Sequence, residues 1–147
     1  MTVGNRTPYG MRGMAARYVD CSDLREFKRR SGRGEALPAS ADHGRAGTLS
    51  NNGPAEPDGA AKATQFLQAM EQAGAPVAFV NNTTGYIAGT EFERAGMIKQ
   101  GAKMTRALTS LRAPKVALCT GVSFGPGIAE CAAPPLERIS CSPGPTR

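Results

Sequence analysis

The run Gly121–Gly125, with the sequence GVSFG, has the residue types of a nucleophilic active site. A G-x-S-x-G loop after a strand can expose its serine at the sharp turn used by many hydrolases. Such a serine needs a histidine base, and the single histidine of this chain, His43, lies upstream of the loop rather than after it. Pro126 stands where the helix after the turn should begin. A serine hydrolase that uses Ser123 is therefore a poor fit to the sequence.

The same glycines allow a second kind of chemistry, because a loop without side chains lets backbone N–H groups approach a substrate. Amides aimed at one oxygen form an oxyanion hole, which stabilises negative charge that develops during a reaction. An ordinary tight turn has the same composition. The loop by itself does not separate these two interpretations.

Composition excludes several other classes of protein. The four cysteines, at positions 21, 119, 131 and 141, show no C-x-x-C spacing, so we expect no metal site and free thiols in a reducing compartment. No long apolar span or signal-peptide pattern is present, which predicts a cytoplasmic protein with no membrane contact. Basic residues cluster between positions 28 and 33 without interleaved aromatic residues, so we expect no nucleic-acid partner.

Residues 47–125 alternate between helical and strand patterns. Residues 58–73 place apolar side chains at helical spacing, with Asp58 as the expected N-cap and Gly74 just past the end. A second helix is expected over 91–111. Each helix precedes a short apolar run, at 76–80 and at 116–119, that is typical of a strand buried on both faces. This order predicts an α/β protein with parallel strands.

Both predicted strands end in glycine-containing loops, at Gly85 and at 121–127. Ligands of open α/β sheets bind outside the carboxyl ends of the strands, so we expect any site to lie in these two loops. Lys62, Lys99 and Lys103 could meet the phosphates of a nucleotide-like ligand, although a solvated helix face is the simpler interpretation of each.

Residues 1–46 form a lead-in segment with weaker patterns. Amphipathic helical pieces are expected at 11–19 and at 22–30. Residues 31–46 are rich in Gly, Ala, Ser and Arg and have no usable period, which predicts a loop or disorder.

Three runs of residues together resemble a known family. The runs are GTLSNNGPAEPDGAAKATQFLQ, NNTTGYIAGTEFERAGMIKQGAKM and APKVALCTGVSFG. They are similar to the carboxyltransferase (β) subunits of biotin-dependent acyl-CoA carboxylases, in the branch that acts on geranyl-CoA and 3-methylcrotonyl-CoA. Residues 6–28 resemble the segment that opens the C-terminal half of those subunits. The resemblance covers most of 6–30 and nearly all of 47–125, is poor over 31–46 and fails after 125.

The resemblance implies an α/β fold of the crotonase-like (ClpP/crotonase) type, a superhelix of β-β-α repeats, here incomplete. It implies transfer of a carboxyl group from carboxybiotin to an unsaturated acyl-CoA. The biotin would be carried on a partner α subunit and not bound covalently to this chain, and other β subunits would complete the active site. Backbone amides in two oxyanion holes would stabilise the enolates of biotin and of the thioester, which suits loops without titrating side chains.

The resemblance also implies site residues. Thr84, Gly85 and Tyr86 match one biotin-side loop, and Ser123 and Phe124 match the other. Gly125 would supply a backbone oxyanion donor, and the next donor would come from an alanine where this chain has Pro126. Proline has no N–H, so that donor is lost. No metal ligand is implied.

The sequence departs from the family pattern at Pro126. Reading from the last base of the Gly125 codon, codon degeneracy permits the family's Ala-Gly-Asn-x-Gly-Met-Cys-Gly and a later Trp-Pro-Asn-Ala. We therefore interpret residues 126–147 as an out-of-frame, disordered tail. We expect residues 47–125 to be a partial carboxyltransferase domain that is inactive alone. The alternative is a non-catalytic remnant that only binds carboxylase partners.

Overall fold

Four strands form a single sheet that positions the loops of interest. The computed structural model describes residues 26–28, 35–41 and 44–123. The strands are β1 (Glu35–Ala41), β2 (Gly44–Asn52), β3 (Val77–Thr83) and β4 (Lys115–Ser123), and they lie in the order β1-β2-β3-β4. β1 pairs antiparallel with β2, whereas β2, β3 and β4 are parallel.

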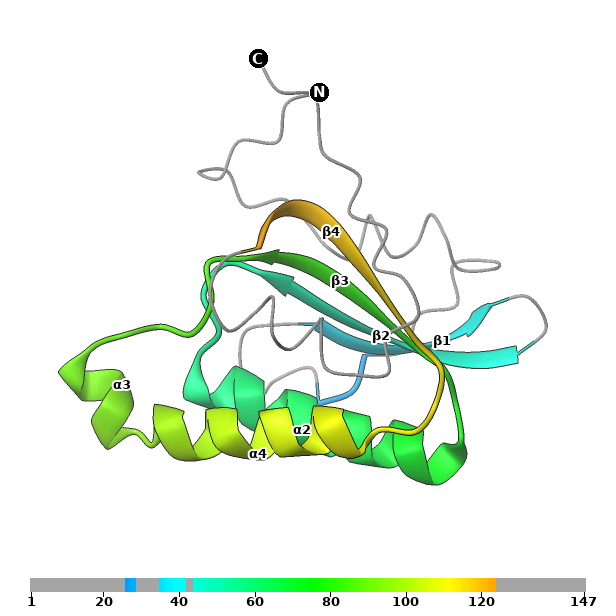
Figure 1. Cartoon of the computed structure of the whole chain (residues 1–147), viewed down its shortest axis with the longest axis horizontal. Coiled ribbons are helices and arrows are strands. Elements are labelled where there is room, and N and C mark those ends of the chain that lie inside the picture. Colours follow the sequence, from blue (N-terminus) through cyan, green and yellow to red (C-terminus); the bar gives the residue numbers. More distant parts are fainter. Residues whose placement is uncertain (1–25, 29–34, 42–43, 124–147) are drawn as a thin grey trace, which may run out of the picture.

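The helices connect the parallel strands. Helix α2 (Pro57–Ala73) joins β2 to β3, and helices α3 (Thr90–Arg94) and α4 (Met97–Ser110) join β3 to β4. Figure 1 shows α2 and α4 side by side along the same face of the sheet. Right-handed crossovers that step in one direction along a sheet place their helices on the same face, which accounts for the two-layer arrangement.

The core lies between these helices and the sheet. In the paired strands Leu49 lies opposite Phe79, and Phe79 lies opposite Ala117, so these three side chains form one row on the helix-facing side. Helix α2 covers the row with Phe66 and Leu67, which are 0% and 1% exposed. Burying side chains of this size contributes about 1.5–3 kcal/mol each, so the packing of α2 on this row stabilises the fold.

The structure confirms most of what the sequence predicted for the helix over 58–73, which is α2. It ends at Ala73, and Gly74 follows in the left-handed conformation with φ of 62°. The N-cap prediction was wrong, because the helix begins at Pro57 and Glu56 occupies the N-cap position without a side-chain hydrogen bond. Proline suits the first helical position, since the N–H that it lacks would have no partner there. Asp58 lies in the first turn, where a negative charge favours the helix dipole.

The prediction of a single helix over 91–111 is wrong. The chain forms two helices that are separated at Ala95 and Gly96, and Gly96 has φ of 87°. The break shifts the buried face, so that Met97, Gly101 and Leu108 are buried while Ile98 is 75% exposed.

The prediction of a loop or disorder over 31–46 is also wrong for the residues that the structure describes. Residues 35–41 and 44–46 belong to β1 and β2, which pair as a hairpin. Pro38 lies within β1 and cannot donate a ladder hydrogen bond, but β1 is an edge strand and tolerates it. Backbone pairing between the two adjacent strands of the hairpin, rather than side-chain period, makes this segment a strand.

Part of the lead-in segment contacts α2. Residues 26–28, the described part of the helix expected over 22–30, are not helical, and Lys28 has φ of 48°. The rest of 22–30 lies outside the described residues. The Phe27 ring packs against Phe66 with 5.8 Å between ring centroids, and Lys28 hydrogen-bonds to Gln65. The helix expected over 11–19 lies outside the described residues.

Candidate functional site: the loop that follows β3

The site candidates lie at the carboxyl ends of the parallel strands, as the sequence predicted. Thr83 is the last residue of β3 and pairs with Ser123, the last residue of β4. The carboxyl ends of β3 and β4 therefore lie side by side at one edge of the sheet. The same edge of an α/β sheet is where ligands usually bind, because loop amides converge there.

Thr83 fixes the start of the loop. Its side chain is 4% exposed, and its Oγ1 donates a hydrogen bond to the Gly53 carbonyl oxygen at 2.9 Å. The same Oγ1 accepts a hydrogen bond from the Gly85 N–H at 3.0 Å. One buried hydroxyl thus links the β3 loop to the turn that follows β2. One residue earlier, the Asn82 side-chain amide donates to Asn52 Oδ1 at 3.0 Å across the same two strands.

A second pair of hydrogen bonds holds the middle of the loop. Ala55 N–H donates to the Gly85 carbonyl oxygen at 2.9 Å, and Ile87 N–H donates to the Ala55 carbonyl oxygen at 3.0 Å. Ala55 and Tyr86 therefore form a parallel bridge. The backbone of the loop is held in one arrangement before any ligand arrives, which is what electrostatic stabilisation by fixed donors requires.

The three predicted residues of this loop have different environments. Thr84 is exposed, Gly85 is buried, and Tyr86 is half-buried. The Gly85 N–H is already bonded to Thr83, so it is not available as an oxyanion donor. Among the three, Thr84 is the residue that the fold presents to solvent.

The second predicted loop lies mostly outside the described residues. The structure places the backbone of Ser123 at the end of β4, while its side chain, Phe124, Gly125 and the residues after them are not described. His43 is also outside the described ranges, so the geometry of a Ser–His pair is not tested. The boundary at 125 and the tail 126–147 remain predictions.

The three lysines considered for phosphate binding do not act together. Lys62 is 3% exposed, and its Nζ lies 3.4 Å from Glu26 Oε1. The solvated-face interpretation was therefore wrong for Lys62, because the lead-in segment covers this part of α2. Lys99 and Lys103 are exposed on α4.

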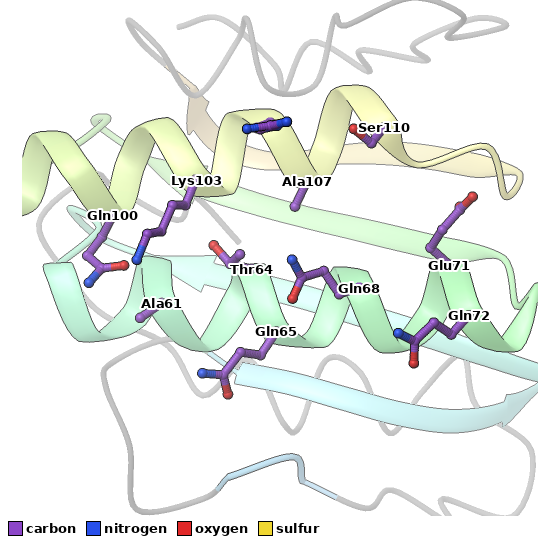
Figure 2. Close-up of a pocket in the computed structure, with 11 residues that line it drawn as sticks. Ala61, Thr64, Gln65, Gln68, Glu71, Gln72, Gln100, Lys103, Ala107 and Ser110 are labelled. Atoms are coloured by element: carbon purple, nitrogen blue, oxygen red, sulfur yellow. The ribbon is translucent and has the colours of Figure 1, made fainter.

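A groove of about 840 Å³ runs along the outer side of the two helices. Figure 2 shows Gln100 and Lys103 of α4 reaching toward α2, with the strands behind the helices. The groove is lined by Ala61, Thr64, Gln65, Gln68, Glu71, Gln72, Gln100, Lys103, Arg106, Ala107 and Ser110. Of the predicted biotin-side residues that the structure describes with their side chains, Thr84, Gly85 and Tyr86, none lines this groove.

The described part of the chain was compared with the requirements of a metal site and of a membrane span. Within it, no three His, Cys, Asp or Glu side chains gather as a metal site would require. None of its helices is long and apolar enough to cross a membrane.

Comparison with known proteins identifies the family. Residues 2–133 match the model of the carboxyl transferase domain. A probable biotin-dependent acyl-coenzyme A carboxylase beta2 subunit of Mycobacterium tuberculosis is 38% identical over 124 residues, which are 83% of this chain and 23% of the relative. The mitochondrial methylcrotonoyl-CoA carboxylase beta chain of Arabidopsis thaliana is 33% identical over 126 residues, or 85% of this chain and 22% of that one.

Solved structures agree with this result. The beta subunit of Pseudomonas aeruginosa geranyl-CoA carboxylase is 40% identical and superposes with a TM-score of 0.83, covering 88% of this chain and 25% of that subunit. Transcarboxylase 12S has a TM-score of 0.81 at 20% identity, which shows the shared fold. The chain belongs to the carboxyl transferase family, and its sheet and helices are part of the crotonase-like α/β fold that the resemblance implied.

The chain spans about a quarter or less of the length of these relatives. The family match and the superposed structures show that the family and the fold were predicted correctly, and the carboxyltransferase class agrees with the relatives. Sequence reasoning missed Thr83 and Ala55, which fix the loop. Their signal was weak, because a threonine at a strand end and an alanine before a helix are common in any α/β protein.

Proposed function

We propose that this chain supplies the biotin-side part of a carboxyltransferase that moves a carboxyl group from carboxybiotin to an unsaturated acyl-CoA of the 3-methylcrotonyl or geranyl type. The observation that carries the proposal is the fixed loop Thr84–Tyr86 at the same sheet edge as Ser123. A fixed backbone without titrating side chains suits enolate stabilisation, where positioned amides matter more than proton transfer.

The partners follow from the same proposal. Carboxybiotin would arrive on a biotin-carrying α subunit in the cytoplasm, and other β subunits would supply the acyl-CoA side of the site. The relatives are named as beta subunits of biotin-dependent carboxylases, which supports this assignment. Ser123, Phe124 and the backbone N–H of Gly125 would form the second biotin-side loop.

We expect the isolated chain to be inactive. Pro126 lacks the N–H that the family's alanine supplies, and losing one oxyanion donor lowers the rate by about two to three orders of magnitude. The test is a carboxyl-transfer assay with purified chain, carboxybiotin and either 3-methylcrotonyl-CoA or geranyl-CoA. We expect no carboxylated product above the uncatalysed rate, and turnover with either thioester would contradict the expectation.

The out-of-frame origin of 126–147 has its own test. Independent nucleotide reads across the Gly125 codon should reveal one inserted or deleted base. An intact frame in all reads would rule out this interpretation.

One observation favours the second candidate function, a non-catalytic protein that binds carboxylase partners. Val116 and Leu118 on β4 are 54% and 42% exposed, although their strand was predicted to be buried on both faces. Exposed apolar side chains on an edge strand suit contact with another chain. Co-purification with a biotinylated α subunit, without turnover, would support this candidate.

A further inference from the structure

A glycine of α4 lies directly against the loop that follows β3. A Cβ atom placed on Gly101 would come within 3.2 Å of Tyr86 Cζ, 3.4 Å of its Cε2 and 3.6 Å of its hydroxyl oxygen. Gly101 is buried, and Tyr86 is half-buried. The hydroxyl-bearing end of the tyrosine ring therefore lies against α4 at a point where an added side chain would have to push it away.

The contact adds a third attachment to a loop with two others. Thr83 Oγ1 binds Gly53 and Gly85 at the start of the loop, and Ala55 forms the bridge with Tyr86 in the middle. These hydrogen bonds join the loop to the turn after β2. Among these contacts, the Tyr86 ring is the one that joins the loop to α4.

We propose that Gly101 is a positioning residue for carboxybiotin: by receiving the Tyr86 ring, it holds the β3 loop where Thr84 faces the ligand. This inference rests on the proposed function and assigns different roles to the residues of the loop. Tyr86 is the anchor, Gly85 is the fixed backbone unit, and exposed Thr84 is the contact residue.

Two effects of Gly101→Ala have opposite signs, which makes the variant informative. Alanine favours a helix more than glycine does, so helix propensity alone predicts a more stable protein. The contact predicts a displaced ring and a loosened loop, because a Cβ at 3.2 Å requires Tyr86 to move by a few tenths of an ångström.

The first experiment measures amide hydrogen exchange on the full chain. The reporters are the Gly85 N–H, bonded to Thr83 Oγ1, and the Ile87 N–H, bonded to the Ala55 carbonyl oxygen. Both should exchange roughly tenfold faster in Gly101→Ala, whereas the Val77 N–H, bonded to the Pro114 carbonyl oxygen, should be unchanged. Ala102→Ser, at the exposed neighbouring position of α4, is the matched control and should change neither reporter.

Tyr86→Ala tests the same contact by removing the ring instead of adding a clash. It should also accelerate exchange at Gly85 and Ile87. Adding Gly101→Ala to Tyr86→Ala should produce no further acceleration. Unchanged reporters in both single variants, or a full extra effect in the double variant, would overturn the positioning role.

The second experiment titrates D-biotin into the labelled chain and follows the Thr84 amide resonance. We expect a saturable shift in the wild type that is strongly reduced in Gly101→Ala. If the exchange results hold and biotin moves no resonance of the wild-type loop, the biotin-side assignment is wrong while Gly101 still places the loop. If biotin moves the Thr84 resonance equally in both proteins, the positioning role is wrong.

Discussion

Helices α2 and α4 pack on the same face of one sheet, yet they differ in what they bury. α2 is a single helix of 17 residues and buries seven of them, including Phe66 and Leu67. α4 has 14 residues and buries three, and Ile98 in its first turn is 75% exposed. α2 thus stabilises the core, whereas α4 contributes less apolar burial and instead carries Gly101, against which the loop packs.

The largest expected effect of a substitution lies on α2. Phe66→Ala should lower the free energy of unfolding by about 3–5 kcal/mol, because the ring is fully buried and leaves a cavity. Denaturant titration of the full chain measures this loss. Ile98→Ala on α4 is the matched control and should change the free energy by no more than about 0.5 kcal/mol. Equal losses from the two variants would contradict the difference between the helices.

The charged residues of the two helices should also differ. Glu26→Gln should cost about 2 kcal/mol, because it weakens the ion pair of buried Lys62 on α2. Lys103→Gln, on the exposed side of α4, is the comparison and should be close to neutral. Thermal unfolding of both variants gives the measurement. A neutral Glu26→Gln would show that the lead-in segment does not support α2.

The break before α4 should be sensitive to a small side chain. Gly96→Ala should cost about 1 kcal/mol, because φ of 87° is unfavourable for a residue with a Cβ. Apart from Gly96, its chain neighbours and the backbone of its own helix, no atom of the described residues lies within 4 Å of the position where that Cβ would be, so we expect backbone strain as the cause. A gain in stability, measured by denaturant titration, would indicate that α3 and α4 can merge into one helix.

The smallest expected effect is at the exposed apolar residue of α4. Ile98→Gln should leave the unfolding free energy within about 0.5 kcal/mol and leave exchange at Gly85 and Ile87 unchanged. A large destabilisation would mean that Ile98 is covered in solution, and that α4 buries more apolar surface than it does in the structure.

Prediction from the sequence succeeded where the signal was local and continuous. The apolar period of α2, its glycine end and the apolar run of β3 are each contained in fewer than twenty residues, and all three were found. The period failed at Ala95 and Gly96, because one left-handed residue rotates the following helix and changes which side chains face the sheet. The hairpin of β1 and β2 was missed because ladder hydrogen bonds leave little trace in side-chain pattern.

The features of the candidate site likewise divide into those that the sequence predicted and those that only the structure revealed. The sequence by itself determined the family, the crotonase-like fold class and the position of the β3 loop, because these depend on motif residues and on the order of helices and strands. Only the tertiary structure decided that Gly85 is bonded to Thr83, that Lys62 is buried against Glu26, and that Tyr86 packs on Gly101. The Thr83–Gly85 bond is local, whereas the other two contacts join residues that are far apart in the sequence. Their distances are set by how the helices pack on the sheet, which no local pattern encodes.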